Sequence, residues 1–173
     1  MTTTLLPLFH VPPETADKVF LEMADGSTLT YQRFFALTAR LAHALQGCGV
    51  KPGDRVAVQV DKSPEALALY IACVRAGAVY LPLNTAYTAS EIDYFVGDAE
   101  PRLVVCRPSV QSEISAIAAK IGGQAATLGT AGDGSLMALA ADQPETFEDH
   151  SASPDDLAAI LYTSGTTGRS KAP

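Results

Sequence analysis

Short apolar runs alternate with segments of helical periodicity along most of this chain, and this alternation constrains the fold more than any other feature. The runs at 55–60 (RVAVQV), 79–83 (VYLPL), 102–106 (RLVVC) and 157–162 (LAAILY) are rich in apolar residues. Strands that are apolar on both faces are typical of a buried parallel sheet, and the crossover connections of such a sheet place helices over it. We therefore expect an α/β fold with a mostly parallel sheet flanked by helices.

The first elements are predicted from turn and capping residues. Segment 19–31 reads as two short strands around Asp25-Gly26, a residue pair that readily supplies the positive φ angles of a hairpin turn. Thr30 is the expected N-cap of the helix that follows. That helix should end at the glycines 47 and 49, and its core face is formed by Phe34, Leu37, Leu41 and Leu45.

Three more helices are expected between the later strands. Ser63-Pro64-Glu65 has the features of a helix start, and this helix should run to about Ala76. Ser90 is predicted to cap the next helix, with Asp93 three residues further on, and residues 113–121 form another. Residues 122–154 are rich in Gly, Ala, Asp and Pro, so we expect a surface excursion with only a brief helical pattern at 136–140.

Composition and charge argue against several classes of function. The formal net charge of −7 and the sequence pI near 4.8 disfavour binding to nucleic acid or to an anionic membrane, since both require a basic surface. The three cysteines have no CxxC spacing and the three histidines are scattered, so we expect buried free thiols and assign no metal ligand. The beginning lacks the pattern of a secretory signal, and a cytoplasmic location is expected by default.

The residues after the last apolar run have the composition of a phosphate-binding loop. Gly165 and Gly168 allow the backbone to turn tightly and to present amide N–H groups to an anion. Hydroxyl groups that can donate to phosphate oxygens stand on Thr163, Ser164, Thr166 and Thr167. Positive charge is available from Arg169 or Lys171. The alternative is a solvated linker of Gly, Ser and Thr, because these residues are common in loops.

Two familiar nucleotide motifs do not fit this segment. A Walker A loop requires GxxxxGK[ST], whereas Gly168 is followed by Arg-Ser-Lys, and no GxGxxG follows the first strand. An unrelated nucleotide-binding α/β protein would also need an acid near the loop to hold magnesium. Asp155 and Asp156 precede the last strand, which places them roughly 15–20 Å from the loop at the rise of a strand.

The order of residues 162–171, YTSGTTGRSK, resembles the phosphate-binding motif of the adenylate-forming superfamily, which includes acyl-CoA synthetases, luciferases and peptide-synthetase adenylation domains. The resemblance extends through nearly the whole chain. Segments 30–58 and 75–105 look like earlier landmarks of the same superfamily. It implies that residues 1–173 form an N-terminal subdomain, incomplete, of the large N-terminal domain of such an enzyme.

Within the superfamily, residues 82–106 and 155–171 look most like malonyl-CoA synthetases, which join malonate to coenzyme A through a malonyl-adenylate. Peptide-synthetase domains share AGAVYLPL but usually continue with LDPxYP, where this chain has Leu83 and then NTAYT. The substrates implied are ATP, malonate or a similar carboxylate, and CoA. Another carboxylate substrate remains a second possibility.

Carrying the motif over residue by residue, the resemblance implies that ATP phosphates are bound by Thr163, Ser164, Gly165, Thr166, Thr167, Gly168 and Lys171. These residues would neutralise charge on the leaving pyrophosphate, and we assign no catalytic acid or base.

The ligands of Mg²⁺, the acyl pocket and the small C-terminal domain of the family are expected outside residues 1–173. The family usually places glycine after the motif lysine, whereas Ala172 and Pro173 follow here. These residues alone are therefore expected to be inactive. The competing hypothesis is an inactive interaction module that self-associates through the surface left by the missing part.

Overall fold

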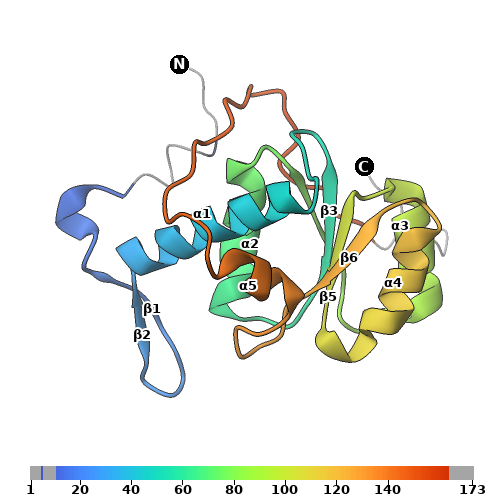
Figure 1. The fold of residues 1–173 in the computed structure, drawn as a ribbon, viewed down its shortest axis with the longest axis horizontal. Coiled ribbons are helices and arrows are strands. Elements are labelled where there is room, and N and C mark those ends of the chain that lie inside the picture. Colours follow the sequence, from blue (N-terminus) through green and yellow to red (C-terminus); the bar gives the residue numbers. More distant parts are fainter. Residues whose placement is uncertain (1–4, 6–10, 164–173) are drawn as a thin grey trace.

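The computed structural model describes residue 5 and residues 11–163 (Figure 1). Its strands are β1 Val19–Glu22, β2 Thr28–Thr30, β3 Arg55–Gln59, β4 Val79–Pro82, β5 Leu103–Cys106 and β6 Gln124–Thr127. Its α-helices are α1 Tyr31–Gly47, α2 Pro64–Arg75, α3 Ala89–Ala99, α4 Gln111–Ala119 and α5 Ser135–Ala140. Short 3₁₀ helices are η2 Pro13–Thr15 and η3 Pro108–Val110.

Four strands of the described chain form a parallel sheet in the order β4-β3-β5-β6. Val56, the second residue of β3, is opposite Tyr80 on one side and Leu103 on the other. The predicted α/β fold with a parallel sheet is confirmed. The predicted hairpin is confirmed as well, because β1 and β2 pair antiparallel around Gly26, whose φ of 81° only glycine adopts readily.

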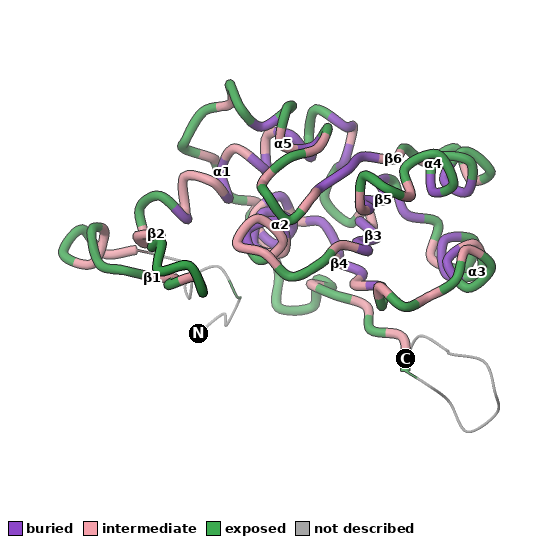
Figure 2. The backbone as a smooth tube through the Cα atoms, turned by 90° about the horizontal axis from the view of Figure 1, so that it is seen from below, coloured by how far each residue is buried: buried purple, intermediate pink, exposed green. Residues whose placement is uncertain are grey.

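Helices cover both faces of the sheet, and each strand contributes alternate side chains to the two layers (Figure 1). Val56 and Val58 of β3 point toward α1, α2 and α5, where Phe34 is completely buried. Ala57, between them, points toward α3 and α4 and packs with Phe95. Figure 2 shows the buried residues concentrated along the sheet and along the helix faces that contact it. Burial of these two apolar layers is the main force that holds the fold together.

Capping side chains begin helices α1, α2 and α3, although one prediction was wrong. Thr30 and Ser63 accept hydrogen bonds from the backbone amides of the third helical residue, as predicted. For α3 the cap is Thr88 rather than Ser90. The Thr88 hydroxyl accepts from the Glu91 amide while the Glu91 carboxylate accepts from the Thr88 amide, and this reciprocal pair outcompetes a single hydroxyl two residues later.

The region predicted as a surface excursion contains a strand of the main sheet. Residues 124–127 form β6 beside β5, so the prediction for 122–154 was wrong in this part. The sequence QAAT lacks the β-branched run of the other strands, and Gln124 at its start is exposed. Its pairing comes from the neighbouring strand rather than from local preference. The brief helical pattern at 136–140 is confirmed by α5, and the helix predicted at 113–121 lies two residues earlier, at 111–119.

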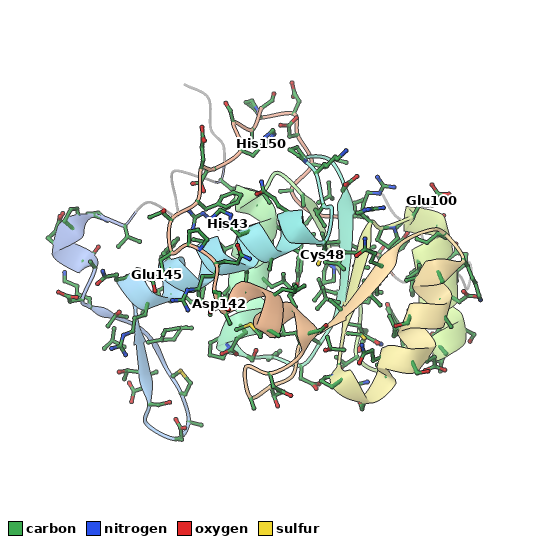
Figure 3. All side chains as sticks on the ribbon, in the orientation of Figure 1. His43, Cys48, Glu100, Asp142, Glu145 and His150 are labelled. Carbon is green, nitrogen blue, oxygen red and sulfur yellow. The ribbon has the colours of Figure 1, made fainter. Side chains whose placement is uncertain are left out.

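Residues 141–157, hereafter the strap, run from α5 across α1 (Figures 1 and 3). His43 of α1 donates from Nε2 to the Thr146 carbonyl oxygen, and its ring meets Phe147 edge-on. Arg75 of α2 is largely buried and donates to the Asp149 carboxylate over 2.6 Å. Because these contacts join helices to a segment without regular structure, they determine its path.

The three cysteines are free and buried, as predicted. Burial raises the pKa of all three thiols, that of Cys106 to about 11, so they are protonated near neutral pH. Among the helices within the described residues, none combines the length and the apolar character needed to cross a membrane.

Candidate functional site

The beginning of the predicted phosphate loop lies beside the edge strand β4. The Tyr80 amide donates to the Ala158 carbonyl oxygen, and the Ile160 amide donates to the Tyr80 carbonyl oxygen, both over 3.0 Å. The resulting bridge between Tyr80 and Ala159 is parallel. The chain therefore runs on from Ala159 in the direction of β4, and exposed Thr163 lies toward the carboxyl end of the sheet. This is the edge at which parallel α/β sheets bind ligands.

The strand predicted at 157–162 is wrong in extent, since the structure has single bridge residues, Ala159 and Thr163, in its place. Ile160 and Tyr162 pack inward onto the α3 and α4 layer, as a strand would require. Leu157 and Leu161, on the opposite face, are 64% and 57% exposed. Within the described residues this face has little to pack against. Apolar composition predicted a longer strand because it does not show whether both faces are covered.

Tyr162, the residue before the loop, is held by helix α3. Its ring lies 4.5 Å from the Phe95 ring, measured between centroids, and its hydroxyl donates to Asp98 Oδ2 over 2.6 Å. Burial raises the pKa of the Tyr162 hydroxyl, and the hydrogen bond to Asp98 and its negative charge raise this pKa further. The hydroxyl is therefore a stable donor near neutral pH. Sequence reasoning missed this contact because 64 residues separate the partners.

Thr163 is the one predicted site residue that the structure describes, and its position at the carboxyl edge agrees with a role in the loop. The predictions for Ser164, Gly165, Thr166, Thr167, Gly168 and Lys171 lie outside the described residues. Their contacts with phosphate remain predictions.

The central place for a ligand in such a sheet is closed by the chain itself. Between β3 and β5 the strand order reverses direction, and open α/β sheets commonly bind nucleotides there. Here the buried Gln59 amide donates to the carbonyl oxygens of Asn84 and Tyr87, and Arg107 donates to that of Thr85. The segment after β4 is thus tied over the reversal point. This arrangement favours a ligand at the β4 edge instead.

An open groove of about 370 Å³ lies between α2 and β4, next to the beginning of the loop. Most of its wall is apolar, and it includes Tyr70, Tyr80 and Leu83, while Asp61, Lys62 and Ser63 form a polar end. Tyr80 belongs both to the groove and to the bridge with Ala159. Burial raises the Tyr80 pKa to about 12, so its hydroxyl is neutral under ordinary conditions.

The two acids that precede the loop are engaged in a turn. Asp156 accepts from the Ser153 amide and lies 3.9 Å from His150 Nε2, while Asp155 is exposed. Among the described residues no cluster of three or more His, Cys, Asp or Glu side chains could hold a metal ion.

Comparison with known proteins identifies the family of this chain. The model of the family described as AMP-binding enzyme matches residues 8–172. The chain belongs to the AMP-binding enzyme family. The resemblance to adenylate-forming enzymes inferred from the loop and the earlier segments is thereby confirmed.

Solved and curated members of the AMP-binding family are similar over most of this chain. ATP-bound MatB from Rhodopseudomonas palustris is 51% identical, with a TM-score of 0.94, over 99% of this chain and 34% of its own. Oxalate–CoA ligase of Arabidopsis thaliana is 33% identical over 95% of this chain and 33% of its own length. Feruloyl-CoA synthase of an Amycolatopsis species is 36% identical over 84% and 28%. The chain thus spans about a third of the length of these relatives.

Proposed function

We propose that this chain supplies the phosphate-binding loop of an ATP-dependent acyl-CoA synthetase whose carboxylate substrate is malonate. The observation that carries the proposal is the 51% identity to ATP-bound MatB over 99% of this chain. The position of Thr163 at the carboxyl edge of the sheet supports it. The resemblance of residues 82–106 and 155–171 to malonyl-CoA synthetases supports the choice of malonate.

In the proposed reaction a malonate carboxylate oxygen attacks the α-phosphorus of ATP, and the bond to the β-phosphate oxygen breaks. Pyrophosphate leaves, and malonyl-adenylate forms. The thiolate of CoA then attacks the acyl carbon and displaces AMP, which gives malonyl-CoA. Residues 163–168 and Lys171 would donate hydrogen bonds and positive charge to the β- and γ-phosphates, where negative charge grows as pyrophosphate leaves.

Magnesium and CoA are assigned to the part of the enzyme that completes the site. The ligands of Mg²⁺ are assigned to residues outside 1–173, as the resemblance to the superfamily implies, and no step of the mechanism is routed through the ion here. When bound elsewhere in the enzyme, Mg²⁺ would neutralise phosphate charge. The role of this chain is to bind and orient the phosphates of ATP.

A second candidate is the same chemistry on a different carboxylate. Its support is that relatives at 33–36% identity are an oxalate–CoA ligase and a feruloyl-CoA synthase. Oxalate is a small diacid like malonate, whereas ferulate is a bulky aromatic acid. A panel of malonate, oxalate, ferulate and acetate therefore separates the candidates by charge and by size.

The test measures pyrophosphate release from ATP by the full-length gene product with each acid in turn. We expect release with malonate to exceed release with the other three acids. Replacing Lys171 by Ala should lower kcat/KM roughly 10- to 100-fold, because a positive charge at the leaving group is lost. Lys120→Ala is the control, since Lys120 pairs with Asp93 on the surface between α4 and α3.

The outcomes are distinct. Preferred release with oxalate or ferulate would support the second candidate. An absence of release with every acid would contradict both candidates and favour an inactive interaction module. Equal loss in Lys171→Ala and Lys120→Ala would contradict the role given to the loop lysine.

A further inference from the structure

The segment before the phosphate loop is attached to the sheet by backbone hydrogen bonds to β4. Backbone hydrogen bonds to Tyr80 hold residues 158 and 160. Leu161, the next residue, is 57% exposed. The backbone pairing described for Tyr80 therefore stops three residues before Thr163, the first predicted phosphate ligand.

Tyr162 provides a second attachment beyond the end of that pairing. Its ring packs on Phe95, and its hydroxyl donates to Asp98 over 2.6 Å, a length typical of a hydrogen bond to a charged acceptor. The ring contact limits where the side chain lies, and the hydroxyl contact fixes its direction. Together they set the orientation of the backbone that continues into Thr163.

Helix α3 is a rigid support for this attachment. Ile92, Phe95 and Val96 are at most 3% exposed in the layer beneath the sheet. The capping box of Thr88 and Glu91 secures the start of the helix. Asp98 itself is exposed, so its carboxylate is free of any packing role and its described contact is with Tyr162.

We propose that Asp98 is a positioning residue, which acts through the Tyr162 hydroxyl to orient the backbone at Thr163, the first predicted phosphate ligand, for ATP binding. This inference rests on the proposed function. A carboxylate near a binding site for phosphates is electrostatically unfavourable, so a hydrogen-bonding role accounts for an acid at this position better than a charge role does. Small displacements of binding groups are costly for catalysis, which makes the attachment consequential.

The electrostatic and positioning roles predict opposite results for Asp98→Asn. If the negative charge mattered, its removal would strengthen ATP binding. If positioning matters, the amide oxygen of Asn still accepts from Tyr162, and ATP binding should remain within about twofold of wild type. Asp98→Ala removes the acceptor and should weaken ATP binding.

The experiment uses the full-length gene product and measures kcat, the KM for ATP and the KM for the carboxylate, with ATP affinity by calorimetry. Tyr162→Phe and Asp98→Ala should each raise the KM for ATP roughly five- to tenfold, with little change in the KM for the carboxylate. The double variant should show no larger effect than either single variant, because both remove the same hydrogen bond. Tyr94→Phe is the control, since Tyr94 contacts the same Phe95 ring and no side-chain hydrogen bond is described for it.

Asp98 is exposed, so Asp98→Ala should fold even if Tyr162→Phe is poorly expressed. If wild type binds ATP and the KM for ATP is unchanged in both variants, this inference is overturned and the proposed function stands. Tighter binding in Asp98→Asn, or an equal rise in both KM values, would also overturn it. A wild type that does not bind ATP would overturn the proposed function and this inference together.

Discussion

Replacing Arg75 by Ala should release the strap from helices α1 and α2. The guanidinium group is the centre of this contact: Nε donates to Asp149 over 2.6 Å, and Nη1 donates to Thr38 Oγ1 over 2.8 Å. Longer bonds of 3.3 Å reach the carbonyl oxygens of Phe35 and Phe147. The group also lies over the Phe147 ring, 5.7 Å from its centroid.

The expected cost follows from how little water reaches this side chain. Arg75 is 12% exposed, so its loss leaves the buried Thr38 hydroxyl and two carbonyl groups without this partner. Two short bonds to a charged donor contribute about 1.5–3 kcal/mol each, and the longer ones contribute less. Because relaxation and water recover part of this sum, the free energy of unfolding should fall by about 3–4 kcal/mol.

Arg40→Ala is the matched control, because Arg40 also joins a helix to the strap. Its pair with Glu145 is exposed, with 37% and 62% of the two side chains accessible, so its loss should cost less than about 1 kcal/mol. Urea unfolding followed by circular dichroism measures both variants, and cleavage of the strap by a dilute protease reports its release. Equal costs for the two variants would refute the reasoning that burial makes Arg75 the stronger attachment.

Three further predictions concern the same structure. Gly77→Ala should lower the free energy of unfolding by about 2–3 kcal/mol, because φ is 72° and the new methyl group would overlap the His150 ring. Gly53→Ala is the control: φ is 84° but the space is open, so urea unfolding should show a loss of only about 1 kcal/mol. The three cysteines should not react with a thiol reagent in the folded protein and should all react after unfolding; rapid reaction of the folded form would contradict their burial. Tyr80 has a raised pKa of about 12, so the stability that its neutral hydroxyl contributes is complete below the ordinary tyrosine pKa and is lost as pH rises from about 10 toward 12. Tyr80→Phe should remove that part of the loss of stability in alkaline unfolding curves. Identical curves for the variant and wild type would count against this prediction.

The parallel sheet could be predicted because the apolar composition of most of its strands reflects their burial. Val56, Val58 and Leu103 are buried by helices, and the sequence shows this as uninterrupted apolar runs. Residues 124–127 pair with β5, and their composition contains no comparable pattern. The prediction failed because the buried residues of this strand, Ala126 and Thr127, are small or polar and therefore do not stand out as an apolar run.

The candidate site divides in the same way. The order of hydroxyls, glycines and a lysine at 163–171 indicated phosphate binding without any coordinates, because each residue type has its own part in binding an anion. The contact between Tyr162 and Asp98 left no local pattern, since either residue is unremarkable in its own segment. It exists because α3 and the segment after the strap pack on the same layer.

The sequence by itself determined the family, the alternation of strands and helices, and the residue types available to grip a phosphate. These properties are local, since they follow from side-chain chemistry and from the conformations that each short segment prefers. Only the tertiary structure decided that residues 84–87 cover the reversal point of the sheet, that the loop begins at the β4 edge, and that Arg75 holds the strap. Those contacts join residues far apart along the chain, so they are fixed by the way the layers pack and not by any one segment.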